Sequence, residues 1–180
     1  LLEAPHFQNT SLFIEAHRSQ AVSDEVFYTI IGQMLRDDRE SMKLLGIRAA
    51  DSTLYISSFN ALVFSLEDSQ SSTKVRDAAR KGLRKYQEVS QLPLIKSILK
   101  SAASPVALVT AASLLNRIIN IQKELPVDPE KLKELGHHPQ VEVFQDFLPI
   151  LEELAKSNQD SFVLSSVNTA LDTLQALMEV

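Results

Sequence analysis

One stretch of this 180-residue sequence concentrates side chains that could bind anionic groups. Residues 74–85 contain six basic residues and a single acidic one, Asp77. On a helix, at about 100° per residue, the basic side chains fall opposite an apolar arc that includes Val75, Ala79 and Leu83. Arginine and lysine on such a face suit contact with carboxylates or phosphates. The predicted binding residues are Arg76, Arg80, Arg84, Lys81 and Lys85, with Arg117 extending the surface from a later helix.

Two interpretations of this basic face stay open. It is either a docking surface for an acidic peptide, a nucleic-acid backbone or an anionic membrane, or a solvated helix face. The overall net charge is −5, but residues 61–121 carry 9 basic and 4 acidic side chains, whereas residues 122–180 carry 4 basic and 11 acidic ones. The acidic C-terminal third could therefore neutralise the basic face within the same chain.

The composition argues against nucleic acid as the partner. The sequence pI is about 5.4. The chain has no Trp, and no aromatic residue is interleaved among the basic residues. Nucleic-acid-binding surfaces normally combine a basic domain with stacking side chains. An acidic peptide is therefore favoured over a phosphate backbone.

No arrangement of residues in the sequence predicts catalysis or a cofactor. The chain has no Cys, and its four glycines are isolated, which excludes Gly-x-Ser-x-Gly and phosphate-cradling motifs. The adjacent His137 and His138 would not face each other on a helix and are expected in an exposed loop before Pro139 rather than at a metal. We therefore expect no enzyme activity, no cofactor and no bound metal.

The elements that must position the basic face are helices. Apolar residues recur at steps of three and four along most of the chain, and hairpin dipeptides are absent. Ser104–Pro105 reads as an N-cap followed by the first helical residue, and Pro149 must kink or divide a helix. Helices are predicted at 24–37, 40–51, 53–67, 73–88, 92–102, 105–121, 140–155 and 161–178. The predicted core is Phe27, Ile31, Leu35, Leu45, Phe59, Leu62, Leu83, Leu99, Leu115, Ile118, Phe144, Leu148, Leu151, Val167 and Leu174.

The second helix of each predicted pair repeats one pattern, in which large apolar residues flank a small or short one at steps of four. The instances are Met42/Gly46/Ala50, Val75/Ala79/Leu83, Val106/Thr110/Leu114 and Val163/Val167/Leu171. A small middle residue lets neighbouring helices pack closely. The organisation predicted is a single repeat domain over 1–180, with an N-terminal segment at 1–22 and an inserted loop at 124–139 that contains a short helix from Pro129 to Leu135.

This pattern resembles HEAT and armadillo repeats, which stack helix pairs. In the HEAT family an Asp near the end of the first helix precedes a Val-Arg pair that opens the second. Here Asp37 precedes Met42-Lys43, and Asp68 precedes Val75-Arg76; the later Val106-Ala107 and Phe162-Val163 lack the basic residue. The resemblance implies an all-α, right-handed α–α superhelix of about four helical pairs, and a ladder of Asp–Arg hydrogen bonds between neighbouring repeats.

In such stacks the second helices line the concave surface. The resemblance therefore implies a non-enzymatic scaffold that binds a protein or peptide partner, with an acidic peptide favoured, on its second-helix face. One alternative is a structural or oligomerisation module in which the apolar helix at 161–178 pairs with another copy or with a longer chain. A HEAT-like nucleic-acid-processing enzyme is a remote alternative. We expect no transmembrane segment, and the cytoplasm is slightly favoured as the compartment.

Overall fold

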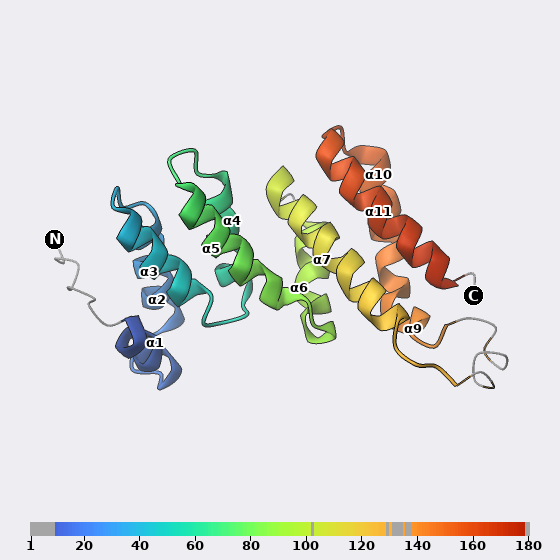
Figure 1. Cartoon of the computed structure of the whole chain (residues 1–180), viewed down its shortest axis with the longest axis horizontal. Helices are drawn as coiled ribbons and strands as arrows, with labels where there is room; N and C mark the ends of the chain where they lie inside the picture. Colours follow the sequence, from blue (N-terminus) through green and yellow to red (C-terminus); the bar gives the residue numbers. More distant parts are fainter. Residues whose placement is uncertain (1–9, 102, 129, 131–134, 136–137, 179–180) are drawn as a thin grey trace. The chain divides into compact units, whose positions relative to one another are not determined.

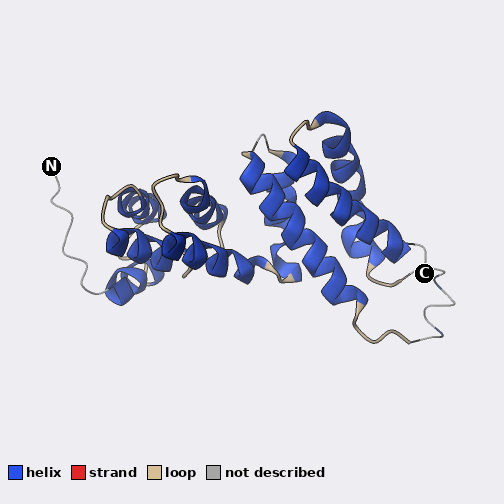
Figure 2. Ribbon diagram, turned by 45° about the horizontal axis from the view of Figure 1, so that its top comes forward, coloured by secondary structure: helices blue, strands red, loops and turns tan. Residues whose placement is uncertain are grey.

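The structure, a computed structural model, describes residues 10–101, 103–128, 130, 135 and 138–178. Every regular element in these residues is a helix, as the sequence predicted (Figures 1 and 2). The chain forms two compact units, Leu1–Lys85 and Tyr86–Val180. Each unit has its own apolar core.

The first unit consists of two helix pairs and a preceding helix. The pairs are α2 (Asp24–Leu35) with α3 (Glu40–Ala50), and α4 (Ile56–Glu67) with α5 (Thr73–Leu83). α3 packs on α5 and α2 packs on α4, so the second helices form one layer and the first helices the other (Figure 1).

A helix that the periodicity did not predict, α1 (Thr10–Arg18), begins the described chain. Its His17 stacks on Phe27 of α2 with ring centroids 3.9 Å apart, and the His17 Nε2 atom lies 2.7 Å from the Asp24 Oδ1 atom. Phe13 and His17 lie one helical turn apart on the side of α1 that faces α2. This spacing was the sequence feature from which α1 could have been predicted.

The second unit has the same kind of two-layer packing. It contains α6 (Leu92–Lys100), α7 (Pro105–Lys123), α9 (Val141–Phe144), α10 (Leu148–Ser157) and α11 (Ser161–Met178). α7 and α11 lie side by side along their length, while α6 and α10 pack together behind them in the view of Figure 1.

Local capping explains where several of these helices begin. Ser104 caps α7 by accepting a hydrogen bond from the Ala107 N–H at 3.2 Å, and Ser72 caps α5 in the same way. Pro149 divides the predicted helix at 140–155 into α9, a single 3₁₀ turn and α10, because proline has no N–H to donate and is tolerated in a first helical turn. The predicted short helix at 129–135 lies largely outside the described residues.

The predicted core is buried with two exceptions. Phe27, Phe59 and Leu115 are fully buried. Leu45 and Leu148 are only half-buried. On α3 the buried stripe passes through Gly46 and Ala50, so Leu45 lies at its edge; Leu148 begins α10, where the interrupted helix restarts.

Close approach of α3 to α2 depends on Gly46. A Cβ atom there would lie 3.0 Å from both the Cβ of Met34 and the Cδ2 of Leu35. Met34 Cβ is fixed to its backbone and cannot move aside cheaply. Gly32 of α2 differs, because a Cβ there would meet only the terminal guanidinium of Arg36, at 2.9 Å. The sequence prediction that a small residue permits tight packing is therefore confirmed at Gly46.

These two glycines give a matched test of packing against helix propensity. Replacing a helical glycine by alanine gains about 1 kcal/mol of intrinsic propensity, whereas overpacking costs about 1–3 kcal/mol. We expect Gly32→Ala to stabilise the protein, by about 0.5–1 kcal/mol, and Gly46→Ala to destabilise it. Urea unfolding followed by circular dichroism measures both, and stabilisation by Gly46→Ala would show that α2 and α3 are not in close contact.

Candidate binding groove

The helix that carries the basic face, α5, is positioned by its apolar side. Val75, Ala79 and Leu83 are buried, and α5 packs on both α4 and α3. Gly82 allows this contact, since a Cβ there would lie 3.0 Å from the Cδ1 of Leu62 on α4. With that side fixed, the charged side must face outward.

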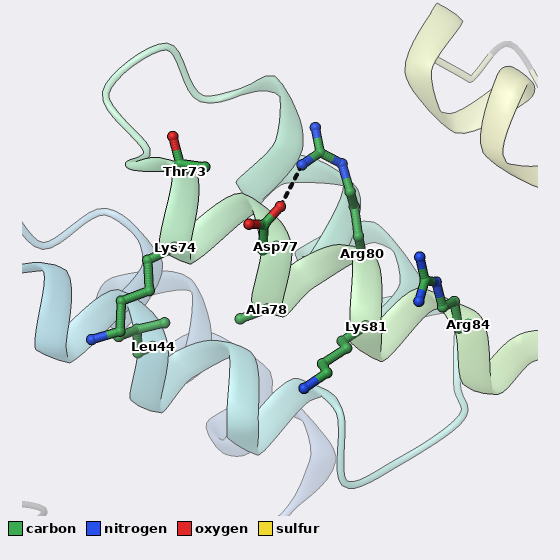
Figure 3. A pocket seen from close by; sticks show the side chains of 8 residues that line it. All are labelled: Leu44, Thr73, Lys74, Asp77, Ala78, Arg80, Lys81 and Arg84. Atoms are coloured by element: carbon green, nitrogen blue, oxygen red, sulfur yellow. Dashed lines mark hydrogen bonds and ion pairs between the residues drawn. The ribbon is translucent and has the colours of Figure 1, made fainter.

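A groove of about 730 Å³ lies along the exposed side of α5, next to α3. Figure 3 shows two rows of side chains there. Lys74 and Lys81 extend on the α3 side, close to the apolar Leu44 and Ala78, whereas Asp77, Arg80 and Arg84 extend on the other side. Thr73 completes the lining at the N-terminal end of α5.

The four cations of the groove differ in how far they are already neutralised. The Arg80 Nη1 atom donates to the Asp77 Oδ1 atom at 2.7 Å. The Lys74 Nζ atom lies 3.8 Å from the Glu40 Oε1 atom. Lys81 and Arg84 are exposed, and neither forms an ion pair with any residue that the structure describes. These two side chains therefore keep their full charge for a ligand.

Two residues of the predicted binding site form hydrogen bonds within the protein instead of facing the groove. Arg76 is half-buried, and its Nη2 atom donates to the backbone carbonyls of Asp68 and Ser69 at 3.1 and 3.4 Å. The Lys85 Nζ atom donates to the Asp51 Oδ2 atom at 2.6 Å. Neither lines the groove. Arg76 holds the loop between α4 and α5. The helix predicted at 73–88 ends at Leu83 and is followed by a 3₁₀ turn, Arg84–Tyr86, which Lys85 ties to the end of α3.

Arg117, the predicted extension of the basic face, is exposed on α7. It belongs to the second unit, and its part in binding stays a prediction. In the groove, the structure brings together Arg80, Lys81 and Arg84 of the predicted residues.

Five residues that line the groove were not among the binding residues predicted from the sequence: Leu44, Thr73, Lys74, Asp77 and Ala78. The lysine and the aspartate were visible signals, because Lys74, Asp77 and Lys81 follow one another at steps of three and four and so share a helix face. Leu44 could not be found in this way, since it comes from a helix some thirty positions away in the sequence. Only the packing of α3 on α5 places it in the groove.

A buried ion pair holds the two walls of the groove together. The Lys43 Nζ atom of α3 lies 2.5 Å from the Asp68 Oδ2 atom, at the end of α4, with side chains 8% and 17% exposed. The Lys43 ammonium, aided by hydrogen bonds from the Gln70 backbone N–H and the Ser71 hydroxyl, holds the pKa of Asp68 below its usual value. Asp68 also accepts from Arg76 through its backbone carbonyl. One aspartate thus joins α3, α4 and α5.

The first aspartate of the predicted ladder, Asp37, is paired locally. Its carboxylate accepts hydrogen bonds from the Arg39 side chain at 2.8 and 2.7 Å, and these bonds lower the pKa of Asp37 to about 2. Asp37 therefore stabilises the turn between α2 and α3 rather than a neighbouring pair.

Within the part of the chain that the structure describes, no cluster of three or more potential metal ligands occurs, and none of the helices could cross a membrane. The prediction of an exposed loop is wrong for His138, which is buried; its Nδ1 atom accepts a hydrogen bond from the Gln140 N–H at 3.3 Å. His137 lies outside the described residues.

Comparison of the chain with protein-family models, with curated proteins and with solved structures finds no match.

The Lys43–Asp68 pair gives a prediction for stability and its pH dependence. Lys43→Met leaves a largely buried carboxylate without its cation, so we expect a loss of about 2–3 kcal/mol at pH 7, somewhat below the cost for fully buried pairs. Because the folded-state pKa of Asp68 is lowered, its contribution is complete above the unfolded pKa and disappears as the pH falls through the folded one. The difference between the wild type and Lys43→Met should therefore shrink between pH 7 and pH 3.

Urea unfolding at the two pH values measures this difference. Arg80→Ala is the matched control, because it breaks the exposed Arg80–Asp77 pair and should cost less than about 0.5 kcal/mol. If Lys43→Met has an equally small effect, α3 and the end of α4 are held together by apolar contacts alone.

Proposed function

We propose that this chain is a non-enzymatic scaffold whose α3–α5 groove binds an acidic peptide segment of a partner protein. The observation that carries the proposal is the pair Lys81 and Arg84, which are exposed without an ion-pair partner among the described residues and line the same groove as the apolar Leu44 and Ala78. This groove offers cations and an apolar floor, which are the means of binding rather than of bond breaking.

We further propose that the helix pairs are of HEAT type and stack as a solenoid. The arrangement of second helices in one layer supports this, and so does the Lys43–Asp68 ion pair. The resemblance implied an Asp–Arg ladder between repeats; here a lysine from the first pair takes the arginine's place and reaches the aspartate of the next. In a HEAT stack the second helices line the concave side, where the groove would then lie.

The magnitudes require that ionic and apolar contacts act together. An exposed ion pair contributes up to about 1 kcal/mol, so Lys81 and Arg84 alone would contribute at most about 2 kcal/mol, which corresponds to a dissociation constant of about 30 mM or weaker. Burying one aliphatic side chain of the peptide on Leu44 and Ala78 adds about 1.5–3 kcal/mol. The proposed ligand therefore combines carboxylates with at least one apolar residue.

The alternative role in oligomerisation has weaker support. It rested on the apolar character of residues 161–178, but Val163, Val167 and Leu174 of α11 are buried within the second unit, where α11 packs on α7 and α10. The exposed large apolar side chains of α11 are Phe162, which is 77% exposed, and Met178, which is 38% exposed. A homo-oligomer is a second candidate on the basis of these two residues.

Charge reversal tests the proposed groove. Lys81→Glu combined with Arg84→Glu turns two attractions into two repulsions, so we expect a fluorescent peptide with one leucine and several glutamates to lose affinity at least about tenfold. Fluorescence anisotropy at low and high salt measures this, and the affinity of the wild type should fall as salt rises.

The control is Arg18→Glu combined with Lys123→Glu, which changes net charge equally at exposed positions outside the groove lining. The stability of both double variants should stay within about 0.5 kcal/mol of the wild type. Equal affinity for the acidic peptide and its glutamine analogue would overturn the proposal.

A further inference from the structure

The two ends of the α3–α5 groove differ in charge. At the N-terminal end of α5, Lys74 faces Glu40 at 3.8 Å, and Asp77 lies one turn further along the helix. At the C-terminal end, Lys81 and Arg84 have no carboxylate within ion-pair distance among the described residues. The groove is therefore not a uniform basic surface.

Asp77 is the only carboxylate that the described residues contribute to the lining of the groove. It is separated by three residues from Lys74 and from Arg80 and by four from Lys81, so it is the neighbour of all three cations on the helix surface. Its Oδ1 atom accepts from Arg80 at 2.7 Å, and its side chain is 64% exposed (Figure 3). Asp77 thus holds the position at which a carboxylate of the ligand would otherwise meet Arg80.

We propose that Asp77 is the specificity-determining residue of the groove: it competes with the ligand for Arg80 and restricts acidic residues of the ligand to the end formed by Lys81 and Arg84. The inference rests on the proposed function and specifies its ligand. The bound peptide carries its acidic residues on one side of an apolar residue that lies on Leu44 and Ala78.

Helix geometry sets the spacing of such a peptide. Ala78 precedes Lys81 by three residues and Arg84 by six, which corresponds to about 4.5 and 9 Å along the helix axis. An extended peptide advances about 3.3 Å per residue. Its carboxylates should therefore lie about one and three residues from the apolar side chain. A ligand bound as a helix would instead need its carboxylates about three and six residues from that side chain.

Two labelled peptides of equal composition and charge test the inference. Both carry one leucine and two glutamates. In the one-sided peptide the glutamates lie one and three residues from the leucine on the same side, and in the split peptide they lie two residues away on opposite sides. Each is made in both chain directions, because the direction of binding is not fixed by the groove. We expect the wild type to favour the one-sided peptide by about three- to fivefold, the range of one exposed ion pair.

Asp77→Asn should raise the affinity for both peptides, by about two- to fivefold for the one-sided peptide and more for the split one, so that the preference narrows. The control is Glu15→Gln, which removes the same charge at an exposed position on α1 and should leave the preference unchanged. The expected effect is local, so the melting temperature of Asp77→Asn should match that of the wild type.

Different outcomes separate this inference from the function on which it rests. If charge reversal at Lys81 and Arg84 abolishes binding but Asp77→Asn changes neither affinity nor preference, the proposed role of Asp77 is wrong. The proposal that the groove binds an acidic peptide is then still supported. Tighter binding of a third peptide, with its glutamates three and six residues from the leucine, would show that the ligand does not bind in an extended conformation. If the wild type binds neither peptide more tightly than its glutamine analogue, the proposed function itself fails.

Discussion

The groove depends on one largely buried ion pair, between Lys43 of α3 and Asp68 at the end of α4. Neither group could be buried alone, because an isolated charge in the protein interior costs several kcal/mol. Each therefore requires the other, and their separation of 2.5 Å fixes α3 relative to the loop that leads into α5. The same aspartate also binds Ser71 and, through its backbone, Arg76. The ends of three helices are thereby held at one residue.

Glycine makes the rest of this arrangement possible. Gly46 brings α3 onto α2, and Gly82 brings α5 onto α4. At both positions a Cβ would lie 3.0 Å from a side-chain atom of the neighbouring helix, so the absence of a side chain at the glycine permits the observed helix packing. Both walls of the groove are helices, which suits a surface that must present charges at fixed spacing.

The basic residues of α5 have separate tasks although they look alike in the sequence. Arg76 and Lys85 satisfy carbonyl and carboxylate groups of the fold, and Arg80 is paired with Asp77. Only Lys81 and Arg84 remain without such partners among the described residues. The number of basic residues on a helix therefore overestimates the number of charges available to a ligand, since guanidinium and ammonium groups that already form hydrogen bonds within the protein are not free to bind one.

The sequence by itself determined that the chain is helical, where most helices begin and end, and which apolar residues form the core, because these depend on local capping and on a period of 3.6 residues. It also located the basic face of α5. Tertiary structure decided which of those cations are free, since Asp51, Asp68 and Glu40 approach α5 only through the packing of other helices. It likewise decided that Leu44 belongs to the groove and that Lys43 is buried. Contacts between residues distant in the sequence leave no periodic signal, so only the folded chain reveals them.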